Sequence, residues 1–189
     1  MRKEKKSKFY TGKGYLKEGK FEAYKSLYKH IISLLPEPNE CSKIVDLGCG
    51  VGYFAKVLYE MGYKKYIGVD FSQDMINHAK ENAPYYDYFL SNLYDKGIKE
   101  FFSEYNLFTI IETLEHIKND YQVLEKLPIG SIVVGSVPSS FSSGHVRIFK
   151  GISEVVRRYD NIIKFNFLET RPSIKLNKEI ITVFRGIIK

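Results

Sequence analysis

The alternation of short apolar runs with amphipathic segments constrains the fold of this chain more than any other feature of its sequence. The apolar runs are rich in Val, Ile, Phe and Tyr, which is typical of strands, and they lie at residues 43–48, 65–70, 86–91, 106–112, 131–137, 162–168 and 179–187. Helical spacing of apolar residues follows over 52–62, 72–83, 95–104, 118–127 and 151–159, with an earlier helix over 21–35. Strands alternating with helices of this length form βαβ crossovers and a parallel sheet covered on both faces.

The last two strands follow each other without a strong helical pattern between them, which favours an antiparallel edge. We therefore expect an α/β fold with a doubly wound, seven-stranded, mostly parallel sheet and helices on both faces. A chain of 189 residues fits one such domain. Within it we separate residues 1–40, a basic arm and N-terminal helix expected to cover the pocket, from the domain proper at 41–189.

Composition limits the setting and the partners of the chain. No apolar stretch approaches the roughly 20 residues of a membrane span, and no secretory signal begins the sequence. Cys41 and Cys49 form neither a disulfide framework nor a metal-ligand spacing, so a reducing, cytoplasmic setting without a membrane is expected. Residues 1–8 hold five basic residues and one acidic residue, and so supply +4 of the net charge of +7. This arm is either a solvated tail or a contact for nucleic acid.

A glycine-rich turn and a distant acid point to a ligand at the carboxyl ends of the first two strands. Gly48, Gly50 and Gly52 follow the first strand, where glycine lets the backbone turn tightly and approach a ligand. Asp70 ends the second strand 22 residues after Gly48, about where a carboxylate reaches the hydroxyls of a ribose. In doubly wound sheets, ligands bind at this point of the topology.

A dinucleotide fits this turn poorly. The position that needs the third glycine of a dinucleotide loop is Tyr53. Asp46 precedes the glycines, where its charge repels a phosphate but suits a cation such as a sulfonium or an amino group. The residues therefore disfavour a dehydrogenase.

The segments VDLGCGVG at 45–52 and YIGVDFSQDMI at 66–76 resemble the first two motifs of class I S-adenosylmethionine-dependent methyltransferases. The order of strands resembles the Rossmann-like fold of this family over nearly the whole chain. The resemblance implies S-adenosylmethionine as the cofactor and 41–189 as the domain that binds it.

The same resemblance assigns individual residues to the cofactor. Asp46, Gly48 and Gly50 would line its methionine end, and Asp70 would hold its ribose. Phe71 and Met75 would flank the adenine, while Asn92 and Leu93 match the motif that reads the adenine amino group. That motif usually carries an acid, so Asn92 departs from the pattern and would make a weaker contact. The further cofactor residues that it implies are Cys49, Gly52 and Glu112.

The fourth strand runs into IETLEHI at 111–117, which we expect to face the transferable methyl group. A histidine suits removal of a proton from a hydroxyl acceptor. His116 is the first candidate for a general base, with Glu115 and His145 beside it. A Ser- and Gly-rich loop over 138–147 is expected to act as a lid and to bring His145 and Arg147 to the acceptor side.

Two groups of methyltransferases share this pattern. The E-x-x-E-H run and the G-H-x-R loop resemble a group that includes O-methyltransferases of quinone biosynthesis. Four residues also resemble the metal site of small-RNA 3′-terminal 2′-O-methyltransferases, and imply a divalent metal such as Mg or Mn on Glu112, Glu115, His116 and His145. Plainer roles stay open: Glu115 as a helix cap and His145 as a surface loop residue.

The sequence therefore favours a methyltransferase that acts at oxygen on a small biosynthetic molecule. One alternative is a metal-assisted RNA ribose 2′-O-methyltransferase, with RNA as the partner of the basic arm. A second alternative is a catalytically lapsed module that binds the cofactor only. We further expect the aromatic residues Phe9, Tyr10 and Tyr15 to fold over the pocket.

Overall fold

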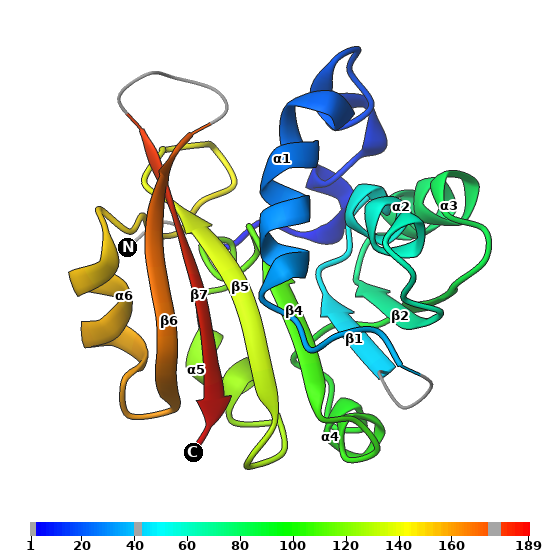
Figure 1. The fold of residues 1–189 in the computed structure, drawn as a ribbon. Helices are drawn as coiled ribbons and strands as arrows, with labels where there is room; N and C mark the ends of the chain where they lie inside the picture. Colours follow the sequence, from blue (N-terminus) through cyan, green and yellow to red (C-terminus); the bar gives the residue numbers. More distant parts are fainter. Residues whose placement is uncertain (1–2, 40–42, 174–178) are drawn as a thin grey trace.

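A computed structural model describes residues 3–39, 43–173 and 179–189 of the chain. Within these residues, seven strands form one sheet in the order β3-β2-β1-β4-β5-β7-β6 (Figure 1). The first five strands run parallel and end at the same edge: β1 (Lys43–Leu47), β2 (Lys65–Asp70), β3 (Asp87–Leu90), β4 (Leu107–Ile111) and β5 (Ile132–Pro138). The antiparallel edge is formed by β6 (Ile163–Pro172) and β7 (Ile180–Ile188). The predicted fold class is confirmed.

Helices cover both faces of the sheet and bury two apolar layers. One layer packs under α1 (Lys20–Ser33), α2 (Tyr53–Glu60) and α3 (Gln73–Asn82). The other packs under α4 (Ile98–Phe102), α5 (Asp120–Leu124) and α6 (Ile152–Tyr159). The central strands β1 and β4 are buried almost throughout, because they have helices on both sides.

Two helices are only half as long as their patterns predict. The model places α5 at Asp120–Leu124 rather than 118–127, and α4 at Ile98–Phe102 rather than 95–104. Arg147 accounts for the late start of α5, because its guanidinium donates to the carbonyls of Leu114, Ile117 and Lys118 and holds this segment as a loop. That loop extends over the end of β4, where the chemistry was expected.

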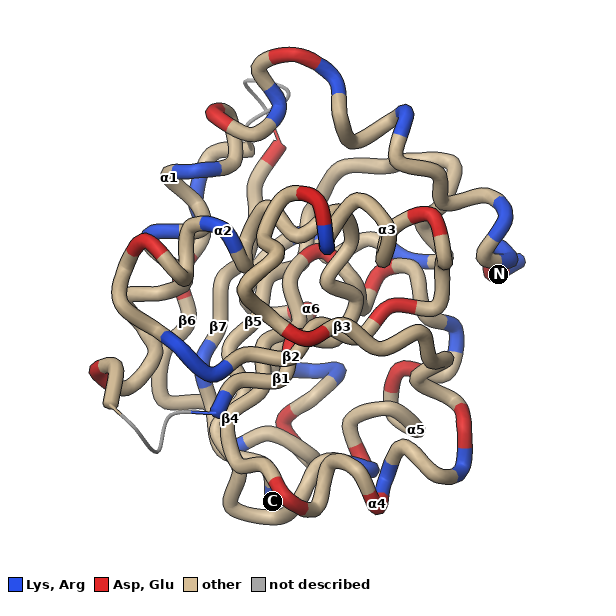
Figure 2. The backbone as a smooth tube through the Cα atoms, turned by 90° about the vertical axis from the view of Figure 1, so that its right-hand side faces the viewer, with Lys and Arg blue, Asp and Glu red and all other residues tan. Residues whose placement is uncertain are grey.

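The segment before α1 is more ordered than a simple loop. It forms two short 3₁₀ turns, η1 (Ser7–Phe9) and η2 (Gly12–Gly14). Figure 2 shows Lys and Arg along this segment and elsewhere on the backbone, where acidic residues interrupt them. Cys41 lies outside the described residues.

Candidate active site

A cavity of about 470 Å³ opens at the carboxyl ends of the parallel strands. Residues from the loops after β1, β2, β3, β4 and β5 line it, together with residues of the N-terminal segment and α1. Parallel strands bring loops that are far apart in sequence to one edge of the sheet, which is where ligands of doubly wound folds bind. The cavity therefore contains residues from both the predicted cofactor site and the predicted chemical site.

The glycine turn after β1 depends on backbone conformations that side chains rarely adopt. Gly48, Gly50 and Gly52 have φ angles of +80°, +54° and +78°. A Cβ on Gly48 would lie 2.6 Å from the Thr113 side chain, and one on Gly52 would lie 2.9 Å from the Ala79 backbone. A Cβ on Gly50 would meet no atom of the described residues within 4 Å. The turn therefore packs tightly at both ends and is open at its middle.

Asp70 is held beside this turn by two backbone groups. The Gly50 N–H donates to Oδ2 at 3.1 Å, and the Ser72 N–H donates to Oδ1 at 2.9 Å. Burial raises the pKa of Asp70, while these hydrogen bonds lower it. A carboxylate has about four acceptor positions, so Asp70 can accept further hydrogen bonds from a ligand in the cavity.

Asp46 lies under the turn and links three strands. Its carboxylate accepts from the Tyr66 hydroxyl of β2 at 2.8 Å and from the Thr109 hydroxyl of β4 at 2.7 Å. Burial raises the pKa of Asp46 to about 6, although both hydrogen bonds act in the opposite direction. The side chain lines the cavity, as a contact with the methionine end requires.

Of the other predicted cofactor residues, all except Gly52 line the cavity. Met75 is buried, whereas Phe71 is partly buried against the Tyr10 ring at 5.3 Å between centroids. The Asn92 amide oxygen accepts a hydrogen bond from the Tyr94 N–H at 3.0 Å, so one of its acceptor positions serves the local turn. Burial raises the pKa of Cys49 well above its usual value, which keeps the thiol neutral. The lining includes Leu93 but not Gly52, which lies against α3.

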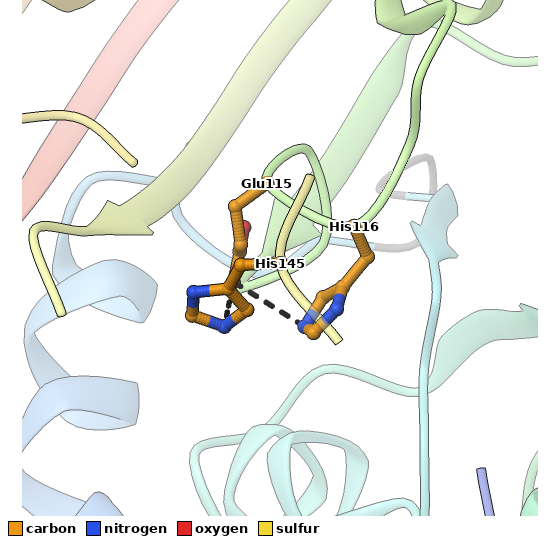
Figure 3. Close-up of side chains that lie close together, drawn as sticks. All are labelled: Glu115, His116 and His145. Carbon is orange, nitrogen blue, oxygen red and sulfur yellow. Dashed lines mark ion pairs between the residues drawn. The ribbon is translucent and has the colours of Figure 1, made fainter. Parts of the chain in front are cut away.

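Glu115, His116 and His145 come together at the other side of the cavity (Figure 3). The Glu115 Oε1 atom lies 3.6 Å from Nε2 of His116 and 3.9 Å from Nε2 of His145. The two imidazole rings are 4.7 Å apart and nearly perpendicular. Glu115 is fully buried, and its carbonyl accepts from the Val146 N–H at 2.8 Å, which fixes the two loops to each other.

Glu112 stands apart from this cluster. Among the described residues, the group with donor atoms within 4.8 Å of one another comprises Glu115, His116 and His145. The Glu112 carboxylate instead accepts from the Ser136 hydroxyl at 3.1 Å, and its φ of +50° places it in the left-handed region. The structure thus brings together three of the four predicted metal ligands, and Glu112 lines the cavity closer to β5.

Three of the sequence-based interpretations of this region are wrong. Arg147 does not reach the acceptor side, because its guanidinium turns back to the loop carbonyls and lies 3.1 Å from the Asp120 carboxylate. A helix-capping role for Glu115 also fails, since α5 begins at Asp120 after its N-cap residue Asn119. His145 is 7% exposed and lies within the cluster rather than on the surface.

The sequence pattern did not reveal the two aromatic residues that α1 contributes to the cavity wall. Tyr24 and Tyr28 lie on α1 and reach the cavity, although the apolar spacing of this helix indicated packing alone. Burial raises the pKa of both phenols. A tyrosine at a core-facing position, where Leu or Ile is the usual choice, was the available signal. Phe9, Tyr10 and Tyr15 line the same cavity from the N-terminal segment.

The fold and the site together define a class of protein, the class I S-adenosylmethionine-dependent methyltransferases. A family model described as a methyltransferase domain matches residues 20–128, more than half of the chain. The chain belongs to this family of methyltransferases.

One curated relative and two solved structures are similar to this chain. The mitochondrial ubiquinone biosynthesis O-methyltransferase of Dictyostelium discoideum is 26% identical over 156 residues, covering 70% of this chain and 49% of that protein. The chain therefore spans about half the length of that relative. The PH0226 protein of Pyrococcus horikoshii has a TM-score of 0.70 at 17% identity, over 95% of each chain. Magnesium protoporphyrin IX methyltransferase of Synechocystis, with bound S-adenosylhomocysteine, has a TM-score of 0.66 at 14% identity, over 89% of this chain and 84% of that chain. These two structures show the shared fold.

None of the helices in the described part of the chain has the length and apolar character that a membrane span requires.

Proposed function

We propose that this chain transfers a methyl group from S-adenosylmethionine to a hydroxyl oxygen of a small biosynthetic molecule, in a cytoplasmic setting. One observation carries the proposal: a single cavity contains both the glycine turn with Asp70 and the cluster of Glu115, His116 and His145. The name of the Dictyostelium relative, an O-methyltransferase, supports oxygen as the acceptor atom.

Each half of the cavity has a separate task in this proposal. Asp70 accepts hydrogen bonds from the ribose, and the open middle of the turn at Gly50 lets the cofactor approach the backbone. Bound S-adenosylmethionine supplies an electrophilic methyl group. His116 takes the acceptor proton as the new bond between carbon and oxygen forms and the bond between carbon and sulfur breaks. Buried Glu115 stabilises the imidazolium that results.

Aromatic side chains shape the acceptor side of the cavity. Tyr15, Tyr24 and Tyr28 line it, and their phenols stay protonated at neutral pH because burial raises their pKa values. Ring-rich walls suit a flat, apolar acceptor and exclude water from the reacting groups. We therefore propose a phenolic hydroxyl as the preferred target.

The cluster also fits a divalent metal such as Mg or Mn. A carboxylate and two imidazole nitrogens offer mixed ligation for a divalent ion and leave positions for a substrate oxygen. In this form of the proposal Glu115, His116 and His145 would hold the ion, which would lower the pKa of the acceptor hydroxyl. Glu112 would not be a ligand, which distinguishes this cluster from the four-residue site that the sequence suggested.

The test is methyl transfer from labelled S-adenosylmethionine to a panel of phenols and catechols, with the protein as purified and after chelator treatment. We expect a labelled methyl ether as the product. We also expect cofactor binding to require Asp46, Asp70 and the glycine turn. Loss of transfer on chelation, with recovery on Mn²⁺, supports the metal; undiminished transfer supports His116 as the direct base. Cofactor binding without transfer to any acceptor contradicts the proposal.

The same assay with small RNA tests the ribose-methylating alternative. RNA is the acceptor if the protein methylates RNA and if this activity falls steeply when salt is raised and when residues 1–8 are removed.

A further inference from the structure

The N-terminal strap, defined here as residues 4–15, crosses the cavity and is attached on both sides. Near its start, the Glu4 carboxylate accepts from the Tyr94 hydroxyl in the loop after β3 at 2.9 Å and from the Lys118 N–H in the loop after β4 at 3.0 Å. On the cofactor side, the Gly12 N–H donates to the Asp74 carboxylate at 2.5 Å. The strap therefore connects the two halves of the site, although it is not one of the loops that follow the strands.

Gly12 lies in close contact with the His78 side chain. A Cβ on Gly12 would lie 2.1 Å from the His78 ring on α3, whereas one on Gly14 would meet no atom of the described residues within 4 Å. Neither glycine has a positive φ angle. The two positions in one short turn thus differ mainly in their contact with α3.

Tyr10 is the point of the strap that touches both halves. Its carbonyl accepts from the Ser72 hydroxyl at 2.8 Å, two residues after Asp70. Its ring packs against Phe71 and, edge to face, against His116 at 5.5 Å between centroids. Its hydroxyl oxygen lies 3.2 Å from Nδ1 of His116.

The two histidines of the cluster have matching arrangements. The Nδ1 atom of His145 lies 2.9 Å from the Ser140 carbonyl. A carbonyl only accepts, so neutral His145 is protonated at Nδ1 and unprotonated at Nε2, the atom that faces Glu115. His116 also turns Nε2 toward Glu115 and Nδ1 toward a polar partner, the Tyr10 hydroxyl.

We propose that Tyr10 is a positioning residue that accepts a hydrogen bond from His116 Nδ1–H, and that the closed N-terminal strap delivers it to the site. This inference rests on the proposed function, in which His116 Nε2 meets the acceptor proton or a metal ion. The hydrogen bond holds the ring and selects the form with an unprotonated Nε2. Because Tyr10 packs against Phe71, the closed strap covers the bound cofactor. The strap must therefore open when the cofactor is exchanged.

Tyr10→Phe tests the hydrogen bond, because it keeps the ring and removes the hydroxyl. We expect kcat to fall about 10-fold, with KM for the acceptor and the affinity for S-adenosylhomocysteine within about twofold. Tyr85→Phe is the matched control, since Tyr85 is exposed and stacks on Tyr59 outside the cavity. An unchanged kcat in Tyr10→Phe would overturn the role of the hydroxyl.

Histidine tautomers give a second readout that needs no acceptor. In long-range proton–nitrogen NMR spectra of histidine-labelled protein, with His116 assigned through His116→Gln, we expect wild-type His116 to carry its proton on Nδ1. Tyr10→Phe should shift the population toward Nε2–H, and Tyr85→Phe should not. A wild-type His116 protonated at Nε2, or an identical spectrum in Tyr10→Phe, contradicts the inference.

A comparison of Gly12→Ala with Gly14→Ala tests whether the strap closes over the site. We expect S-adenosylhomocysteine to protect residues 4–15 from limited proteolysis in wild type and in Gly14→Ala, but not in Gly12→Ala. Protection of all three proteins alike would contradict a docked strap at Gly12. If wild-type protein does not bind S-adenosylhomocysteine, the proposed function is wrong. If wild-type protein binds it and transfers methyl groups, but Gly12→Ala and Gly14→Ala are protected alike, only the inference about the strap is wrong.

Discussion

The two halves of the cavity are built in different ways. The proposed cofactor half is built mainly from two short segments, at the ends of β1 and β2, and the backbone forms much of it: three glycines with positive φ and two N–H groups that donate to Asp70. The acceptor half consists of side chains from the loops after β4 and β5, α1 and the N-terminal strap. A backbone-built site fixes the position of one common cofactor, whereas a side-chain-built site can change its acceptor by substitution.

Asp46 and Gly48 lie where the halves meet. Asp46 links β1 to β2 and β4 through two hydrogen bonds, and Gly48 packs against Thr113 of the loop that leads to Glu115. Substitutions at the boundary should therefore affect both halves, while those inside one half should affect one function.

His116→Ala should give the largest effect and should be confined to the acceptor half. We expect kcat to fall about 10²–10⁴-fold, because proton removal from the hydroxyl loses its base or its metal ligand. The affinity for S-adenosylhomocysteine should stay within about twofold. Steady-state kinetics and calorimetry measure both, with His30→Gln as the control, since His30 pairs with Glu169 outside the cavity. A loss of cofactor affinity as large as the loss of kcat would remove the distinction between the halves.

Gly48→Ala should disturb both halves at once. Its φ of +80° and the 2.6 Å approach of Thr113 both oppose a Cβ, and we expect a loss of about 1–3 kcal/mol in the free energy of unfolding. Gly62→Ala is a matched control, because its φ is +94° but its Cβ would meet an atom no closer than 3.7 Å among the described residues. Denaturant titration compares the two; an equal loss in both would show that the contact with Thr113 adds nothing.

At Asp46, also at the boundary, we expect an effect that depends on pH. Its pKa rises on folding from 3.8 to about 6, so the folded protein binds more protons than the unfolded chain between these values. The stability contributed by this group therefore falls as pH rises from about 4 to 6, by at most about 3 kcal/mol, and is constant above. Asp46→Asn should remove this slope.

Urea titrations of wild type and Asp46→Asn at several pH values measure this pH dependence of stability. Their difference in unfolding free energy should change between pH 4 and 6 and level off above. A difference that is independent of pH would contradict a raised pKa at Asp46.

The order of elements was predictable because buried parallel strands are continuous apolar runs and their helices are amphipathic. The glycine turn and Asp70 were also visible, since short spacing along the chain fixes the geometry of a strand-to-helix turn. The start of α5 was not, because hydrogen bonds from Arg147 to the carbonyls of residues 114–118 hold this segment out of the helix.

The acceptor half was only partly predictable. Glu115 and His116 are adjacent in sequence, and strand order brings His145 to them, but nothing local shows that Glu112 bonds to Ser136 instead. Arg147 was misjudged because a charged residue beside His145 can face either side of its loop. The bond between Tyr10 and His116 joins residues 106 positions apart and has no local signal.

Calorimetric titration of the protein with S-adenosylhomocysteine, beside Asp70→Ala, tests the central claim most directly. The account predicts binding at one site per chain and an affinity about 10–100-fold weaker in Asp70→Ala, because charge-assisted hydrogen bonds to the ribose are lost. Circular dichroism of the variant checks that it is folded. No heat of binding in wild type, or equal affinities in the two folded proteins, would contradict the account.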